Sequence, residues 1–119
     1  MRRVDELTGA ELDYAVAIAD RRVNPYIHEQ QCWVVVSSGQ RPYHFAPSNE
    51  WAIGGPIIER ERITIFTKDS GAWAAEWYAP IGDGTYQLHR MDGPTPLISA
   101  MRAFVASHRG DEIEIPEHT

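Results

Sequence analysis

The chain of 119 residues carries a formal net charge of −6, from 17 acidic and 11 basic side chains, and 43 % of its residues are apolar. This length and composition predict one globular domain spanning residues 1–119 and exclude a disordered chain. The acidic balance disfavours DNA binding, which depends on lysine and arginine contacts to phosphate.

Cysteine content and hydropathy exclude further classes. Cys32 is the only cysteine, so no intrachain disulfide and no zinc site built from several thiolates is expected. Its apolar setting, QCWVVV, predicts a buried side chain. No window approaches the ~20 apolar residues of a membrane span, and the N-terminus lacks the apolar core of a signal peptide. We therefore expect a cytoplasmic protein that does not act at a membrane.

The first predicted element is a helix over Gly9–Ala19. Thr8 and Glu11 have the spacing of a capping box, in which each side chain bonds the other's free backbone N–H. Leu7 and Leu12 have the spacing of a hydrophobic staple around the same helix start. Apolar residues then recur at helical spacing, which predicts one buried face.

The next segment predicts a buried strand over Cys32–Val36, because it is rich in β-branched and aromatic residues. Asn24–Pro25 blocks any continuation of the preceding helix. Ser38–Gly39 indicates a turn, after which Tyr43–Phe45 is expected to pair back as a short second strand. Prolines at 42 and 47 confine that strand to a sheet edge or an extended loop.

The stretch NEWAIGGPIIERERI, which begins at Asn49, predicts two short helical turns. Ser48 is expected to cap the first turn, and Gly54 to end it in left-handed geometry. Gly55–Pro56 then starts a second turn, with proline at its first position. In this interpretation the two glycines mainly change the direction of the chain.

Three strands follow, at Ile63–Asp69, Ala72–Ala79 and Thr85–Asp92. The short joining segments DSG and GDG are strong turn signals, so we expect a three-stranded antiparallel meander. Trp73 and Trp77 are separated by an even number of residues and share one face, so at least one of them is expected in the core.

The second main helix is predicted between Thr95, its cap, and Gly110, its stop, with Pro96 at the first helical position. Leucine, methionine, phenylalanine and valine follow the helical repeat, whereas Arg102 and Arg109 point away from the apolar face. The final EIEIP segment alternates and predicts a short edge strand. The fold class is α+β, with an antiparallel sheet (the meander plus short edge strands) covered by two main helices.

No known catalytic motif is present. The sequence lacks a Walker loop, a dinucleotide GxGxxG, HExxH and GxSxG. The five histidines show no metal-ligand spacing with one another or with carboxylates, so neither a metal nor another cofactor is expected. Enzymatic activity is less expected than its absence, although active sites also assemble from scattered residues.

One group of residues has the chemistry of a ligand site. Gly54 and Gly55 expose backbone N–H groups, and the helix start at Thr95 adds more of them. The site also has two guanidiniums and one stacking ring, from Arg60, Arg62 and Trp51. Together these residues are suited to an anionic, aromatic ligand such as a nucleotide. Each also has a structural explanation, as a direction change, a cap, a solvated charge or a core ring.

Three blocks of the sequence resemble the lambdoid-phage NinX-like family. They are LTGAELDYAVA, FAPSNEWAIGGPIIERERI and GPTPLISAMRAFVASHRGDEIEIP, which run in order from Leu7 to Pro116. Members typically show serine, threonine and aspartate before the tryptophan, where this chain has Ser48, Asn49 and Glu50. The segment from Arg21 to Tyr43 departs most from the family pattern. The resemblance implies a phage or prophage gene product in the host cytoplasm, assigns no biochemical role and carries over no catalytic residues.

The first functional expectation is therefore a non-enzymatic phage accessory protein that binds a host protein or a small anionic ligand such as a nucleotide. The first alternative is a small enzyme acting on a nucleotide or phosphate ester. The second alternative is a self-associating structural module, in which aromatic residues and edge strands form a homo-oligomer interface.

Overall fold

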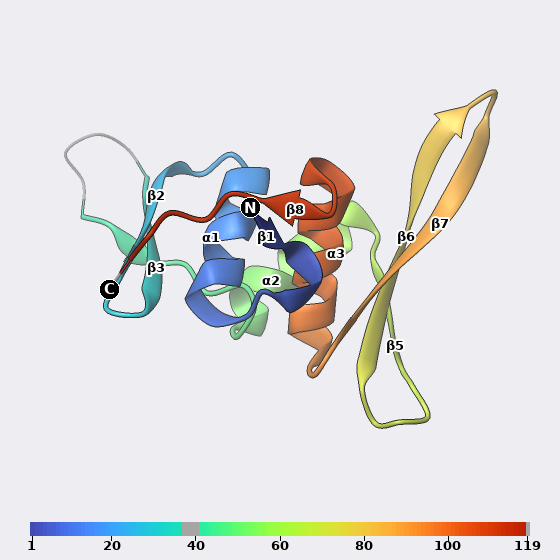
Figure 1. Ribbon diagram of the computed structural model, residues 1–119, viewed down its shortest axis with the longest axis horizontal. Helices are drawn as coiled ribbons and strands as arrows, with labels where there is room; N and C mark the ends of the chain where they lie inside the picture. The colour runs from blue at the N-terminus through green and yellow to red at the C-terminus, as the bar shows by residue number, and fades with distance from the viewer. Residues whose placement is uncertain (37–40, 119) are drawn as a thin grey trace.

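The computed structural model describes residues 1–36 and 41–118, and it confirms the α+β class (Figure 1). Its helices are α1 (Gly9–Ala19), α2 (Trp51–Glu61) and α3 (Pro96–Arg109). They lie between two antiparallel three-stranded sheets, one formed within residues 23–44 and the other within residues 64–93. The short strands thus form sheets of their own instead of extending the meander, and a third helix joins the expected two.

Helix α1 has the predicted bounds, but the predicted capping box is wrong. Thr8 is the residue before the helix, yet its side chain makes no capping hydrogen bond. The Glu11 carboxylate is held elsewhere: Arg2 Nη1 donates to its Oε2 at 2.8 Å, and His118 Nε2 lies 3.2 Å from the same oxygen. Leu7 and Leu12 are both fully buried, as expected of the staple. Tertiary ion pairing has therefore displaced the local cap.

The sheet against α1 contains a strand that the sequence analysis missed. Strand β2 (Val23–His28) pairs with β3 (Gln31–Val35), which in turn pairs with β4 (Tyr43–His44). Asn24–Pro25 lies inside β2, at a register shift between Val23 and Tyr26. This position on an edge strand accommodates a residue that lacks an N–H. The pairing of β3 with β4 is confirmed, whereas the expected Ser38–Gly39 turn lies outside the described residues.

The GGP segment forms one continuous helix, so the prediction of two turns separated by Gly54 is wrong. Neither Gly54 nor Gly55 has a positive φ. A residue before proline usually avoids helical geometry because of its Cβ and N–H, and Gly55 has no Cβ. The helix ends instead at Arg62, at φ 55°, where Ile63 N–H donates to the Ile58 carbonyl in a Schellman arrangement.

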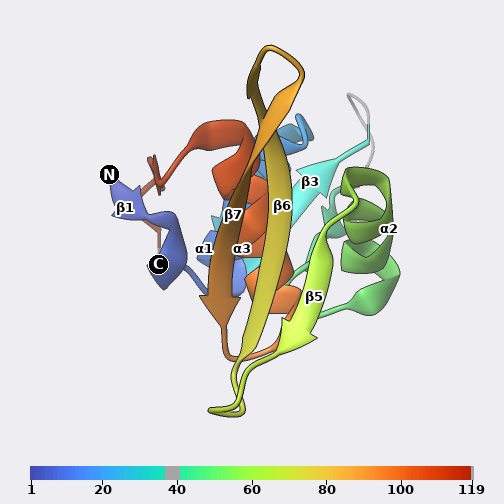
Figure 2. The same cartoon turned by 90° about the vertical axis from the view of Figure 1, so that its right-hand side faces the viewer.

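The meander is confirmed, with strands β5 (Thr64–Thr67), β6 (Trp73–Gly82) and β7 (Thr85–Gly93). Ile65, Ala75 and Met91 lie side by side across it, and Trp77 shares their face. That face packs on α3, and Trp77 is partly buried against the core. In the view from the side of the meander, its strands lie in front of α3, and the turn that joins β6 to β7 projects past the helix (Figure 2).

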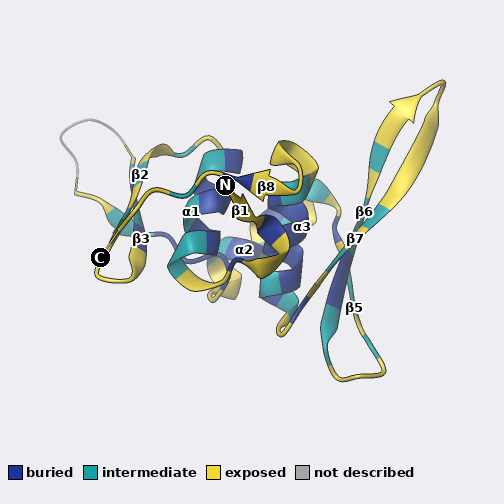
Figure 3. Ribbon diagram, in the orientation of Figure 1, coloured by how far each residue is buried: buried dark blue, intermediate teal, exposed yellow. Residues whose placement is uncertain are grey.

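Helix α3 has the predicted capping. Thr95 Oγ1 accepts the Ile98 N–H at 3.1 Å, Pro96 takes the first position, and Gly110 follows the last residue at φ 83°. The core forms where α3 meets the other helices and the second sheet (Figure 3). Its largest fully buried side chains include Leu7, Leu12, Phe45, Ile57, Met101 and Phe104.

The two ends of the chain meet beside this core. Strand β1 (Arg2–Arg3) pairs with β8 (Glu112–Ile113), and a single 3-10 turn, η1 (Val4–Glu6), follows β1. The predicted C-terminal edge strand is thus present, although it is only two residues long. This pairing brings η1 against α3 and the end of β7.

Candidate functional site

Two of the sequence-predicted ligand residues lie together. Trp51, at the start of α2, and Thr95, before α3, line one hollow of about 240 Å³. Ser48, Asn49 and the first residues of α3 complete its wall. The Trp51 side chain does not belong to the core, since the residue is 54 % exposed. Ligand binding by this pair stays a prediction.

The two glycines have different environments. A Cβ on Gly54 would lie 2.4 Å from the Pro47 carbonyl oxygen and 2.8 Å from Leu97 Cδ2, which lines the same hollow. Gly54 therefore lets α2 approach its neighbours closely. A Cβ on Gly55 would meet no atom within 4 Å outside its chain neighbours and the backbone of α2 itself. Neither glycine presents the open backbone loop that was expected, because both lie within α2.

The two arginines lie at the opposite end of α2, roughly 13 Å along the helix axis from Trp51. Arg60 Nη2 donates to Asp20 Oδ1 at 2.7 Å, and Arg60 Nε donates to Glu61 Oε2 at 3.0 Å. Arg62 is exposed and supplies the left-handed residue that ends the helix. The structure therefore separates the expected constellation into two pairs.

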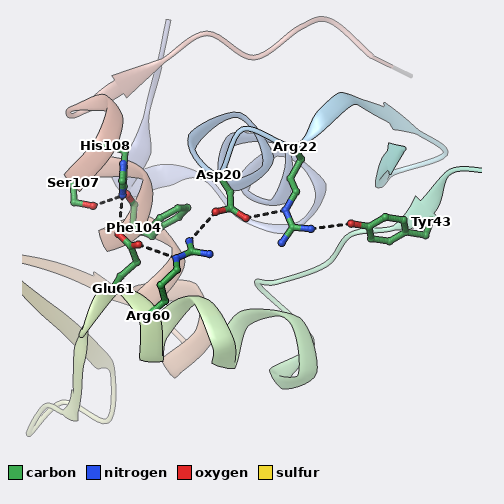
Figure 4. Close-up of polar contacts among 8 residues, drawn as sticks. All are labelled: Asp20, Arg22, Tyr43, Arg60, Glu61, Phe104, Ser107 and His108. Carbon is green, nitrogen blue, oxygen red and sulfur yellow. Dashed lines mark hydrogen bonds and ion pairs between the residues drawn. The ribbon is translucent and has the colours of Figure 1, made fainter. Parts of the chain in front are cut away.

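Arg60 belongs to a chain of polar contacts that crosses the molecule (Figure 4). At one end, His108 Nε2 lies 2.8 Å from Glu61 Oε1. At the other end, Arg22 Nε donates to Asp20 Oδ2 at 2.8 Å, and Arg22 Nη1 donates to the Tyr43 hydroxyl at 2.9 Å. The contacts join α3, α2, the end of α1 and β4, so we interpret the chain as a structural cross-link.

Within this chain, Glu61 is held in its charged form. Burial raises its pKa, but the contacts from His108 and Arg60 outweigh burial, so the pKa of Glu61 lies below its ordinary value. The neighbouring Ser107 is not activated by the histidine, since its hydroxyl donates to the Phe104 carbonyl at 2.7 Å. Adjacent residues on a helix also face different directions. The enzyme alternative stays a prediction.

A buried carboxylate lines a second hollow, of about 310 Å³, which shares Ser48, Asn49 and Ile98 with the first. Asp13 on α1 is 4 % exposed, and its Oδ1 accepts the Ser48 backbone N–H at 2.8 Å. Burial raises the pKa of Asp13 to about 6, although the bonds from Ser48 oppose the rise. Sequence reasoning missed Asp13, because it lies among apolar neighbours in a helix with no partner nearby in the chain.

Cys32 is fully buried, which confirms the expectation from its apolar neighbours. Burial raises the pKa of its thiol to about 12, and the charge on Asp13 adds to the rise. A protonated, enclosed thiol is a poor nucleophile. Cys32 therefore acts as a core residue.

A surface of a different kind lies on the β6–β7 hairpin. Tyr78, Ile81, Tyr86 and Leu88 are exposed by 68, 62, 63 and 47 %, respectively. This part of the hairpin projects beyond the helices, and almost all of it is exposed (Figures 1 and 3). The sequence analysis predicted the strands but not the length by which they extend past the core. The hairpin therefore presents apolar side chains that the fold itself does not need to bury.

Residues 1–36 and 41–118 contain neither a metal-binding cluster nor a membrane-spanning helix. No three histidine, cysteine or acidic side chains in these ranges gather in a way that would hold a metal ion. No helix among the described residues is long and apolar enough to cross a membrane.

Comparison with known proteins agrees with the resemblance seen in the sequence. A search of curated proteins found no significant match. A family model described as "Bacteriophage P22, NinX" matches residues 3–108, which include α1, α2 and the sheet of β5, β6 and β7. The match covers most of the chain, so this protein belongs to the bacteriophage P22 NinX family.

Proposed function

We propose that this phage accessory protein acts in the host cytoplasm by binding a host protein, through the exposed apolar surface of the β6–β7 hairpin. The observation that carries the proposal is the clustering of Tyr78, Ile81, Tyr86 and Leu88 on one projecting element. Scattered exposed apolar residues are ordinary, whereas a contiguous group of this kind marks an interaction site.

The strand register places four of the hairpin's apolar residues on one face. Tyr78 lies opposite Leu88, and Pro80 lies opposite Tyr86. Directly opposed residues share a face of the sheet, and the alternation of side chains puts this face away from Ala75 and Trp77, which lie toward α3. We call these four residues the hairpin strip. Ile81, at the register shift beside the turn, extends the apolar surface to the hairpin tip.

The composition of the hairpin strip suits a protein partner. Tyrosine combines a large apolar ring with a hydroxyl and is enriched where protein interfaces are most tightly packed. With Ile81, the strip exposes on the order of 500 Å² of side-chain surface, which is comparable to the largest apolar patches of monomeric proteins. On the same face, the next opposed pair is Glu76 and Arg90, which carry opposite charges, and Asp83 lies in the turn. A partner surface with a central apolar pocket would bury this strip without burying an unpaired charge.

We favour a different protein over a second copy as the occupant. Each chain carries a net charge of −6, so two copies that meet at the hairpin bring like charges together. The edge of β7 is still open to strand pairing beyond the part that η1 contacts. The experiment must therefore distinguish a host protein from a second copy of this chain at the hairpin.

Photo-crosslinking in infected cells tests this proposal. A photoreactive phenylalanine derivative at Tyr86 is expected to capture one host protein, and the same derivative at Tyr26, which is 40 % exposed on the opposite sheet, is not. The double substitution Tyr78→Ser and Leu88→Ser should abolish the Tyr86 cross-link. Both residues are exposed, so the melting temperature should hardly change.

Two results would overturn the proposal. A cross-link from Tyr86 to a second copy of the chain would establish self-association in its place. A host cross-link of equal strength in the double variant would show that the hairpin strip is not the binding surface.

A further inference from the structure

Arg102 is a buried cation that no carboxylate neutralises. It lies in the middle of α3, is 8 % exposed, and was expected from the sequence to point away from the core. Its Nε donates to the Leu7 carbonyl at 3.0 Å, and its Nη1 donates to the Asp92 carbonyl at 2.9 Å. Both acceptors are neutral backbone groups. Among the described residues, no acidic side chain lies within 4.0 Å of this guanidinium.

Burial of such a group is costly unless a counter-charge is supplied. Burial lowers the pKa of Arg102, and the charge on Asp5 opposes this effect. A guanidinium nevertheless keeps its proton under physiological conditions. Asp13 differs in this respect, because a carboxylate with a pKa of about 6 can become neutral by taking up a proton. The positive charge of Arg102 is permanent.

The guanidinium opens onto a hollow of about 610 Å³, between η1, the end of β7 and α3. The two N–H groups on Nη2 have no hydrogen-bond acceptor among the described residues. Among the described residues, every side-chain nitrogen or oxygen that is shut off from solvent has a hydrogen-bond partner. Nη2 therefore keeps some access to solvent, and Arg102 is one of the residues that line the hollow.

The acids in the wall of this hollow already have bases of their own. Arg3 donates to both oxygens of Asp5, at 3.1 and 2.7 Å, and Lys68 Nζ donates to Asp92 Oδ2 at 2.7 Å. A second guanidinium, that of Arg90, also lines the hollow and lies only 3.7 Å from Asp92 Oδ1. The wall itself therefore holds two acids and two bases, and among them Arg102 is the base with no acidic side chain within 4.0 Å in the described part of the chain.

The volume and the remaining lining indicate what kind of anion fits. Pockets for small organic ligands occupy about 300–1,000 Å³. Met91, Ala72 and Pro94 provide apolar wall beside the two guanidiniums. Guanidinium groups match the planar, paired oxygens of carboxylates and phosphates. A bare inorganic ion would leave the apolar wall without contact.

We propose that this hollow binds a small organic anion, with its phosphate or carboxylate group on Arg102 Nη2 and Arg90 and its apolar body against Met91 and Pro94. This anion site lies on different residues from the hairpin strip. The proposal is therefore independent of the protein-binding function proposed above.

Titration of the full chain, followed by isothermal calorimetry and by amide NMR shifts, tests the anion site. The probes are phenyl phosphate, adenosine monophosphate, benzoate and inorganic phosphate, at constant ionic strength. We expect saturable binding of at least one organic probe, with shifts centred on Met91 and Gly93. Tighter binding of phenyl phosphate than of benzoate would assign the head group as phosphate, and the reverse order would assign it as carboxylate.

Three variants separate this site from general charge effects. Arg90→Gln removes a half-exposed wall residue together with its ion pair to Asp92. It should weaken binding roughly five- to tenfold and lower the melting temperature only slightly, because exposed pairs contribute little to stability. Arg102→Lys keeps the charge but loses the planar donors, so binding should fall at least tenfold. Arg62→Gln removes an exposed charge outside the hollow and should bind like the wild type.

Three outcomes would overturn the proposal. The first is that no organic probe saturates below a dissociation constant on the order of 10 mM. The second is that Arg90→Gln and Arg102→Lys both titrate like the wild type. The third is that Arg62→Gln weakens binding as much as Arg90→Gln, because the effect would then follow net charge and not the hollow. The Arg90 variant keeps the test valid even if Arg102→Lys fails to fold.

Discussion

The carboxylate of Asp13 accepts the backbone N–H of Ser48 at 2.8 Å, and this buried bond joins α1 to the segment that leads into α2. Ser48 is itself 6 % exposed, so its N–H has little access to bulk water. An unpaired buried donor would cost about 1–3 kcal/mol. The bond therefore explains why an acidic residue occupies the core side of α1.

The raised pKa of Asp13 predicts how stability changes with pH. The folded-state pKa is about 6 and the ordinary value is 3.8, so the folded protein keeps this proton longer than the unfolded chain does. The contribution of Asp13 is most favourable below pH 4 and is lost as the pH rises through 6. Asp13→Asn keeps an acceptor for Ser48 and removes this loss. The variant should thus gain up to about 3 kcal/mol relative to the wild type between pH 4 and pH 7.5.

Urea unfolding of both proteins at several pH values measures this difference, because all other titrating groups contribute equally to both. A stability difference that stays constant from pH 4 to pH 7.5 would show that Asp13 does not titrate differently in the two states.

The paired glycines of α2 predict unequal effects of one substitution. In Gly54→Ala the new methyl group meets the Pro47 carbonyl oxygen at 2.4 Å, which is a backbone contact that cannot swing aside. We expect a loss of roughly 1–3 kcal/mol. In Gly55→Ala the methyl group meets nothing within 4 Å apart from its chain neighbours, but its Cβ crowds the ring of Pro56, which offsets the gain in helix propensity. We therefore expect a change smaller than about 1 kcal/mol.

Thermal unfolding of the two alanine variants measures the stability that is lost to the close contact at Gly54, since the two sites are adjacent in the same helix. Equal melting temperatures for the two variants would contradict the close approach of α2 to Pro47.

The position of Arg60 predicts a structural role for this residue. Arg60→Ala removes the bonds to Asp20 and Glu61 and the contact of its guanidinium with the Phe104 ring, 5.7 Å from the ring centre. The side chain is 50 % exposed, so the pair is screened by solvent, and we expect a loss of roughly 1 kcal/mol. Arg62→Ala removes the same charge from an exposed site and makes a suitable control.

Chemical denaturation at low and high salt measures this effect. The loss from Arg60→Ala should shrink in 1 M salt, because screening weakens exposed ion pairs. An effect no larger than that of Arg62→Ala at either salt concentration would remove Arg60 from the structural cross-link.

Much of the fold was predictable because its signals are local. The bounds of α1, the Thr95 cap, the Gly110 stop and the glycine turns of the meander each follow from a few neighbouring residues. Strand β2 escaped prediction because Asn24–Pro25 looks like a break in the chain. Only its pairing with β3 turns this segment into an edge strand. The capping box failed for a similar reason, since Arg2 holds Glu11 from another element.

The candidate sites were less predictable, because they depend on distances between elements. Trp51 and Thr95 line one hollow because the starts of α2 and α3 both border it. Arg60 and Arg62 follow Trp51 closely in the sequence, yet the continuous helix carries them to the other end of α2. Arg102 and Asp13 gave no signal, since each has its partner in a distant segment.

The sequence by itself determined where α1 and α3 begin and end and where the meander turns, since caps, turns and hydrophobic periodicity act within a few residues. Tertiary structure decided that GGP continues one helix, that the hairpin projects beyond the core, and that Arg102 is buried without a counter-charge. The physical reason is that burial and charge pairing depend on which elements pack together, and that is settled only when the whole chain folds around α3.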